Sequence, residues 1–359
     1  MPYIRRTPGG GLEVATWEEA LDLAATRLAD AARRNPAAIG LIGSRRISNE
    51  DAFVLQKFGR EVLGTRNIDS AARIADWPVL KAIRDAGLRP LDDLNAQVRK
   101  AEVIVVVGDA SQAADIVSVK LQNASRYAGA TIVQINPYRT QLSKWHTLDI
   151  RCKPLQEAAV LAAIASQISP SPAVQSQLPT PPEQQNVQNE AIQQAADLIA
   201  NAKSVLFAVC TGHWLRGRAA DVGGALANLV LASGKIGGEG TGVVFLPEKN
   251  NSMGAIEAGL LADLLPGCKP AADPGLTFDQ MLAEAGGLQA LYVVGENIYD
   301  RLPRIPFLVV QDILMSETAK RADVLFPASS YAERQGTFTN FEGRAQWFNR
   351  AIPPVGQAR

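Results

Sequence analysis

The stretch that decides the fold is Val103-Ile104-Val105-Val106-Val107-Gly108-Asp109-Ala110-Ser111, which is followed by a helical segment to Tyr127 and by Thr131-Ile132-Val133-Gln134-Ile135. A continuous β-branched run is typical of a strand that is buried on both faces of a sheet. The order strand–helix–strand predicts a βαβ unit with a right-handed crossover. This stretch therefore predicts an α/β fold with a mainly parallel sheet.

Strand-like and helix-like segments also alternate through the rest of the chain. A capping box at Thr16–Glu19 predicts a helix start, and Ser48 predicts another. The apolar residues of the second helix are predicted to face the core: Phe53, Val54, Leu55, Phe58 and Val62. Further strands are expected at 39–42, 204–209, 291–294, 307–310 and 323–326. At 359 residues the chain is longer than a domain with a single hydrophobic core usually is, so two domains are expected.

Composition narrows the possible functions. Lys+Arg and Asp+Glu number 36 each, and this balance argues against nucleic acid as a partner. With three cysteines, two histidines and no C-x-x-C, the chain is expected to hold neither an iron–sulfur cluster, which needs four thiolates, nor another metal. No apolar run approaches the ~20 residues of a spanning helix, so no membrane insertion and a cytoplasmic location are expected.

Five polar loops follow predicted strands, where α/β folds bind ligands. They are Gly43-Ser44, Gly108-Asp109-Ala110-Ser111, Asn136-Pro137, Gly212-His213 and Gly295-Glu296-Asn297. Glycine lets a ligand approach the backbone, and a following helix N-terminus favours phosphate. Because turns need Gly, Asn and Ser in any case, each loop taken alone is more consistent with a turn than with a site.

None of these loops contains a sequence motif that identifies a particular chemistry. The chain lacks both the G-x-G-x-x-G dinucleotide fingerprint and the phosphate-binding G-x-x-x-x-G-K-[ST]. Nothing in the sequence pairs Cys210 with a base, and a lone His213 is more often a structural residue. The residues alone therefore predict no catalytic group.

Several longer segments, taken together, resemble the molybdopterin oxidoreductase superfamily. The similar segments are Ser48 to Phe58, Gly64-Thr65-Arg66-Asn67-Ile68-Asp69, Glu248 to Ala255, Val310-Gln311-Asp312, Ser316 to Ala319, Ala322 to Ala328, and Glu333 to Arg344. They cover nearly the whole chain in the family's order and spacing.

This resemblance implies two Rossmann-like domains, the first interrupted by the second. Residues 1–140 and 287–359 are expected to form the first domain, and 141–286 the second, with a Pro/Gln/Ser-rich linker at 169–188. The positions that match the family's pterin-binding loops are Gly108, Asp109, Asn136, Arg139, Thr140, Gly212, His213, Gly240, Thr241, Asn250, Asn251, Gly295, Glu296 and Asn297.

The chain departs from the formate dehydrogenase-like pattern after Asp69. Ala75 stands at the position of the metal-binding Cys or selenocysteine, and Asp76 stands where His follows. An alanine methyl cannot bind molybdenum, whereas Asp76 offers an oxygen ligand one position out of register. The iron–sulfur and pterin-capping domains that the resemblance implies are not found in the sequence.

Three hypotheses follow from the resemblance. The leading one is a non-catalytic scaffold, similar to the molybdopterin-like region of the large iron–sulfur subunit of NADH–quinone oxidoreductase (complex I). It implies no cofactor in this chain, other peripheral-arm subunits as partners, and a cytoplasmic place peripheral to the inner membrane. The alternative is a fragment of a formate dehydrogenase-like catalytic subunit that depends on molybdopterin guanine dinucleotide. The third is a nucleotide-binding remnant around residues 136–140.

Overall fold

The computed structural model describes residues 1–7, 9–145, 147–169, 189–212, 215, 217–283 and 287–358. Their contacts divide the chain into two compact units. Unit 1 consists of Met1–Arg73, Asn250–Asn340 and Ala345–Arg359, and unit 2 consists of Ile74–Lys249 and Phe341–Arg344. Apart from residue 169, the predicted linker lies outside the described residues.

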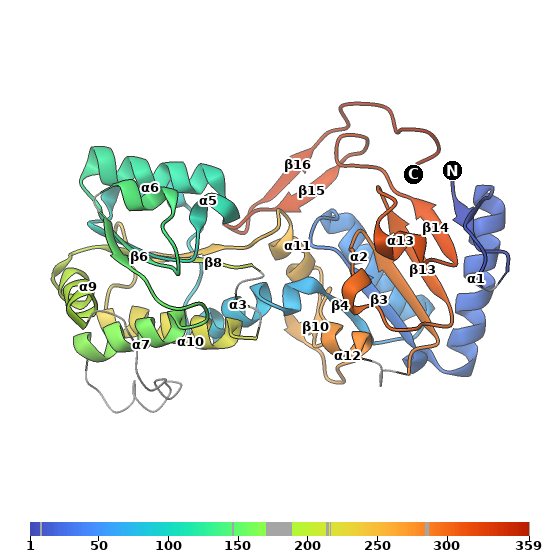
Figure 1. The fold of residues 1–359 in the computed structure, drawn as a ribbon, viewed down its shortest axis with the longest axis horizontal. Helices are drawn as coiled ribbons and strands as arrows, with labels where there is room; N and C mark the ends of the chain where they lie inside the picture. Colours follow the sequence, from blue (N-terminus) through green and yellow to red (C-terminus); the bar gives the residue numbers. More distant parts are fainter. Residues whose placement is uncertain are drawn as a thin grey trace. The chain divides into compact units, whose positions relative to one another are not determined.

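Unit 1 is built on a seven-stranded sheet in the order β2-β1-β14-β13-β12-β3-β4 (Figure 1). Its strands are β1 Tyr3–Ile4, β2 Glu13–Val14, β3 Ile39–Gly43, β4 Ile68–Ser70, β12 Ala290–Val294, β13 Leu308–Asp312 and β14 Val324–Pro327. The sheet is parallel from β14 to β4, whereas β1 runs antiparallel to β14 and β2.

The remaining elements of unit 1 are helices and two small hairpins. The helices are α1 Trp17–Arg34, α2 Asn49–Lys57, α11 Ser252–Glu257, α12 Phe278–Leu282 and α13 Glu317–Lys320. The hairpins pair β10 Leu264–Leu265 with β11 Lys269–Pro270, and β15 Gly336–Thr339 with β16 Ala345–Phe348.

Local sequence signals explain where the first helices of unit 1 begin. The Thr16 hydroxyl accepts a hydrogen bond from the Glu19 amide at 3.1 Å, and the Glu19 carboxylate accepts one from the Thr16 amide at 2.9 Å. Ser48 and Asp51 form the same reciprocal cap at α2. Both predicted caps are confirmed, because they depend only on residues three positions apart.

The predicted buried face of α2 is wrong for three residues. Leu55 is buried and Phe58, just after α2, is partly buried, but Phe53 and Val54 on α2 and Val62 in the turn that follows it are exposed. The apolar residues of this segment cover more of the helix circumference than one buried face, and the neighbouring strands decide which of them face the core.

Unit 2 is built on a five-stranded, all-parallel sheet in the order β7-β6-β5-β8-β9. Its strands are β5 Val103–Val107, β6 Thr131–Ile135, β7 Thr147–Ile150, β8 Val205–Cys210 and β9 Gly242–Leu246. Its helices are α3 Asp76–Asp85, α4 Leu94–Gln97, α5 Ala110–Ala113, α6 Asp115–Ala128, α7 Glu157–Ile168, α9 Asn189–Asn201 and α10 Ala219–Ser233. Helix α6 covers one face of the sheet, and α7 and α10 cover the other (Figure 1).

The central strand of unit 2 is the β-branched run on which the fold prediction rests. Every residue of β5 is buried, and the strand lies between β6 and β8. The predicted α/β class with mainly parallel sheets is therefore confirmed, and the predicted βαβ unit is β5–α6–β6.

The two units differ from the predicted domains in their boundaries. The predicted boundary at 140/141 lies between β6 and β7, which are hydrogen-bonded neighbours in one sheet. By contacts, β5 and β6 group with β7, β8 and β9, and the chain passes between units at 73/74, 249/250, 340/341 and 344/345. The reason is that a strand shares its core with the strands it pairs with, which the sequence order alone does not identify.

Candidate functional site

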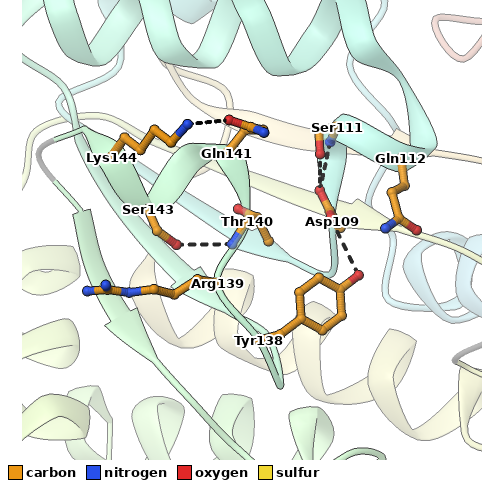
Figure 2. A pocket seen from close by; sticks show the side chains of 9 residues that line it. All are labelled: Asp109, Ser111, Gln112, Tyr138, Arg139, Thr140, Gln141, Ser143 and Lys144. Carbon is orange, nitrogen blue, oxygen red and sulfur yellow. Dashed lines mark hydrogen bonds between the residues drawn. The ribbon is translucent and has the colours of Figure 1, made fainter.

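A pocket of about 510 Å³ opens at the carboxyl ends of β5 and β6 in unit 2 (Figure 2). It is lined by polar side chains from the two loops that follow these strands: Asp109, Ser111, Gln112, Tyr138, Arg139, Thr140, Gln141, Ser143 and Lys144. Parallel strands place their following loops at the same edge of the sheet, which is where α/β folds bind ligands.

Asp109 comes from the loop after β5. It follows Gly108, whose φ of +87° is one that glycine adopts easily. One carboxylate oxygen, Oδ1, accepts hydrogen bonds from the Ser111 amide at 2.9 Å and from the Ser111 hydroxyl at 2.5 Å. The other oxygen, Oδ2, accepts from the Tyr138 hydroxyl at 3.4 Å. The carboxylate is thus fixed through Oδ1, while Oδ2 has only a long contact.

The loop after β6 is held by its own side chains. The Asn136 amide donates to the Tyr138 carbonyl at 3.0 Å, and the Thr140 hydroxyl donates to Gln134 Oε1 at 3.2 Å. Gln134 in turn donates to the Gly108 carbonyl at 2.6 Å, which ties this loop to the one that carries Asp109. The two loops therefore form one connected wall of the pocket.

Two cations and one carboxylate line the pocket, and a second carboxylate, Asp149, lies beside one of the cations. Lys144 Nζ donates to Gln141 Oε1 at 2.9 Å, and Arg139 Nε lies 3.7 Å from Asp149 Oδ2. The Arg139 side chain is 70% exposed and so remains available to an anion. Burial, and then the nearby Asp109 carboxylate, raise the pKa of Tyr138, which therefore keeps its proton at neutral pH. This arrangement suits a phosphorylated ligand that also carries hydrogen-bond donors.

The structure gathers five of the predicted site residues at this edge of unit 2: Gly108, Asp109, Asn136, Arg139 and Thr140. Gly212 follows β8 at the same edge, and His213 lies outside the described residues.

Gly240 and Thr241 precede the first residue of β9 and so lie at the opposite, amino edge of the sheet. There the Gly240 amide donates to Gln97 Oε1 at 2.7 Å, and Thr241 closes a turn onto Gly238. The structure does not bring these two residues to the pocket.

The remaining predicted positions belong to unit 1, namely Asn250, Asn251, Gly295, Glu296 and Asn297. Asn251 is fully buried; it donates to the Ile47 carbonyl at 2.6 Å and accepts from the Thr339 amide at 2.8 Å. Asn297 accepts from the Thr318 hydroxyl at 2.8 Å. These two side chains are used to hold neighbouring segments of their own unit.

The segment at the predicted metal-ligand position is buried in unit 2. Ala75 precedes α3, and Asp76 in its first turn accepts a hydrogen bond from the Thr211 hydroxyl. Burial raises the pKa of Cys152 to about 12 and also raises that of Cys210, so neither thiol is a ready thiolate. Within the described ranges, no three His, Cys, Asp or Glu side chains are grouped so that they could hold a metal ion.

Sequence reasoning missed several pocket residues and one buried acid. Gln112, Gln141, Ser143 and Lys144 line the pocket, and their places in the segments that follow two predicted strands were the available signal. Glu157, the first residue of α7, is buried and neither of its carboxylate oxygens accepts a hydrogen bond. Burial raises the pKa of Glu157.

The molybdopterin oxidoreductase family matches residues 1–359, the whole chain. The chain belongs to this family.

Among relatives, the chain is 30% identical to the F420-dependent formate dehydrogenase subunit alpha of Methanocaldococcus jannaschii, over 99% of this chain and 59% of that protein. It is 27% identical to formate dehydrogenase H of Escherichia coli, over 98% of this chain and 57% of that protein. The chain thus spans less than two thirds of the length of these relatives.

Two solved structures share the fold. Acetylene hydratase from Pelobacter acetylenicus matches all of this chain and 59% of its own, with a TM-score of 0.74 at 14% identity. A chain of the formyltransferase/hydrolase complex from Methylorubrum extorquens matches 98% of this chain and 94% of its own, with a TM-score of 0.66 at 13% identity. At these identities the likeness concerns the fold alone.

The comparisons change which of the predicted hypotheses is best supported. The predicted superfamily is confirmed, but the relatives named above are formate dehydrogenase subunits and not subunits of NADH–quinone oxidoreductase. They favour the alternative hypothesis over the scaffold. The prediction that this chain holds no cofactor is not supported, because the family is named for molybdopterin.

No helix within the described residues combines the length and the apolar character that crossing a membrane requires.

Proposed function

We propose that this chain holds the guanine-nucleotide end of a molybdopterin dinucleotide in an oxidoreductase of the formate dehydrogenase type. The observation that carries the proposal is the polar pocket, lined by Asp109 and the cations Arg139 and Lys144, at the carboxyl ends of β5 and β6. The family match over the whole chain and the formate dehydrogenase relatives support it.

The residues of the pocket fit the polar part of such a cofactor. Arg139 and Lys144 provide charge for phosphates, and Asp109 Oδ2 provides an acceptor for a ligand donor. The Ser143 hydroxyl donates to Asp149 of β7 and the Thr140 hydroxyl donates to Gln134 of β6, so their role is to hold the loop against these strands. When bound, the cofactor would supply the metal centre for oxidation and reduction; these residues bind and orient its nucleotide.

Formate oxidation is proposed for the complete protein and tested there. Full-length protein would be purified without oxygen and assayed for molybdenum or tungsten, for released guanosine phosphate, and for formate-dependent dye reduction. We expect a metal and a guanosine phosphate in stoichiometric amounts, together with dye reduction. Protein that contains neither pterin nor nucleotide would overturn the proposal.

The second candidate is the scaffold of NADH–quinone oxidoreductase, with other peripheral-arm subunits as partners at the cytoplasmic side of the inner membrane. It is favoured by one observation: Ala75 offers no ligand atom, and the Asp76 carboxylate is bonded to Thr211. Full-length protein that copurifies with cysteine-rich electron-transfer subunits, but contains no molybdenum or tungsten, would favour this candidate.

A further inference from the structure

The two oxygens of the Asp109 carboxylate differ in how fully they are used. Oδ1 accepts two hydrogen bonds of normal length from Ser111. Oδ2 accepts one from Tyr138 at 3.4 Å, whereas O–H···O bonds in proteins usually measure about 2.5–3.0 Å. Asp109 is 8% exposed and lines the pocket, so a ligand that enters the pocket has access to this carboxylate. Oδ2 is therefore the acceptor that a ligand gains most from reaching.

Tyr138, which also lines the pocket, occupies this acceptor. Its hydroxyl is directed at Asp109 (Figure 2), and the residue is 49% exposed. The backbone carbonyl of Tyr138 accepts from the Asn136 amide, and the Tyr138 hydroxyl also interacts with the Asn136 side chain. The loop is held as well by Thr140 and Gln134, so the Tyr138 side chain can rotate away while these bonds remain.

Because Oδ2 is the one available oxygen of Asp109, it also limits which ligand group fits. A guanine base presents two neighbouring N–H donors, and pairing with them side by side would need both carboxylate oxygens. Because Ser111 already occupies Oδ1, the site suits a single O–H donor at Oδ2. A ribose hydroxyl is such a donor, and Arg139 and Lys144 on the pocket lining suit the phosphates of the same molecule.

We propose that Tyr138 is a displaceable stand-in for a ribose hydroxyl, so that Asp109 Oδ2 selects ribonucleoside diphosphates over ligands without that hydroxyl. The inference rests on the proposed function and adds to it the ligand group that Asp109 recognises. Displacement exchanges a long hydrogen bond for a shorter one to a charged acceptor, which is the stronger kind.

The test measures binding of two probes by titration calorimetry. Full-length protein would be produced in a host that cannot make the pterin, which leaves the pocket free for GDP and 2′,3′-dideoxy-GDP. We expect the dideoxy compound to bind about tenfold more weakly, as for one lost hydrogen bond to a charged group. Equal affinities for the two compounds, or no binding of GDP at millimolar concentration, would overturn the proposal.

A tyrosine variant separates displacement from direct contact. Tyr138→Phe removes the competing hydroxyl, so GDP should bind about threefold more tightly while dideoxy-GDP is unaffected. Tyr127→Phe is the matched control, because Tyr127 is an exposed tyrosine on α6 outside the pocket. Tyr138→Phe could instead bind GDP more weakly while its circular dichroism spectrum stays the same as that of the control variant. That result would show that Tyr138 is itself a ligand contact and would overturn the proposal.

The result of this binding test is independent of the result of the test of the proposed function. Pterin dinucleotide in the purified holoprotein, with equal binding of GDP and dideoxy-GDP, would refute the role of Asp109 and leave the function standing. Preference for GDP in a protein that never acquires a pterin would refute the function and leave the role of Asp109 standing.

Discussion

The carboxyl edges of the two sheets have similar polar loops but differ in which atoms remain available. In unit 2, Asp109 at the end of β5 keeps one oxygen with a single long contact. In unit 1, Asp312 at the end of β13 accepts from the Ile313 amide at 2.7 Å and from the Ser316 hydroxyl at 3.0 Å. The two edges are alike in polar composition, so what distinguishes them is the hydrogen-bonding capacity that remains at Asp109 Oδ2.

The difference arises from the segment after each strand. Each aspartate lies shortly before a helix, α13 or α5, and one oxygen of each accepts from an amide that follows it. The second oxygen of Asp312 accepts from the hydroxyl of Ser316, the cap of α13. After β5 and β6 the loops bond to each other through Gln134 and leave a pocket between their side chains. Polar atoms form hydrogen bonds with one another where a loop folds onto itself, and they remain available to a ligand where two loops line a pocket.

The largest effect is expected at a polar residue of unit 1 that is used only internally. Asn251→Ala removes a donor from the Ile47 carbonyl and an acceptor from the Thr339 amide, both in a buried place. Leaving these two groups unpaired should lower the free energy of unfolding by about 4 kcal/mol. Urea unfolding would measure this loss, and GDP affinity of the folded variant should not change. A GDP defect without destabilisation would contradict the assigned role.

The next effect is a pH dependence that originates at a buried carboxyl of unit 1. Burial raises the pKa of Asp69 to about 6, against the lowering influence of Arg73 and of the Ser70 and Phe278 amides. The folded state then holds this proton more tightly than the unfolded state, whose carboxyl has the ordinary value of 3.8. Stability from this group is therefore complete below pH 4 and lost as pH rises to about 6, by about 3 kcal/mol.

The measurement is the free energy of unfolding between pH 4 and pH 7 for the wild type and two variants. Asp69→Asn should flatten the slope over this range. Asp85→Asn, at an exposed position of α3, should leave it unchanged. An identical slope in Asp69→Asn would assign the pH dependence to other groups.

A smaller effect is expected from the available carboxylate of unit 2. Asp109→Ala should weaken GDP binding at least about tenfold, because the acceptor for the ligand hydroxyl is removed. It should cost only about 1 kcal/mol of stability through the lost cap of α5. Calorimetry and urea unfolding on the same preparation would check both values, and undiminished affinity would remove Asp109 from the site.

The smallest effect is expected from a cation on the pocket lining. Lys144→Ala should reduce GDP affinity about threefold at low salt and less at high salt, because exposed charges are screened. Lys81→Ala on α3 is the matched control, since Lys81 is an exposed lysine paired with Asp85 away from the pocket. Binding that responds equally to both substitutions would indicate general charge and not a phosphate contact.

Part of the site could be predicted and part could not. Asp109, Asn136, Arg139 and Thr140 follow predicted strands, and the parallel sheet does bring their loops together. Thr241 was predicted with them but lies at the amino edge, because the strand it precedes begins only at Gly242. A glycine-rich segment has the same composition before a strand as after one, so sequence alone does not place it.

By itself, the sequence determined the features that depend on residues close together in the chain. These are the buried strand β5, the caps at Thr16 and Ser48, the α/β class, and the family. Only the tertiary structure decided which face of α2 is buried, where the units divide, and that Tyr138 reaches Asp109. The physical reason is that caps and strand propensity involve neighbours along the chain, whereas burial and the use of a hydrogen-bonding atom depend on residues that folding brings together.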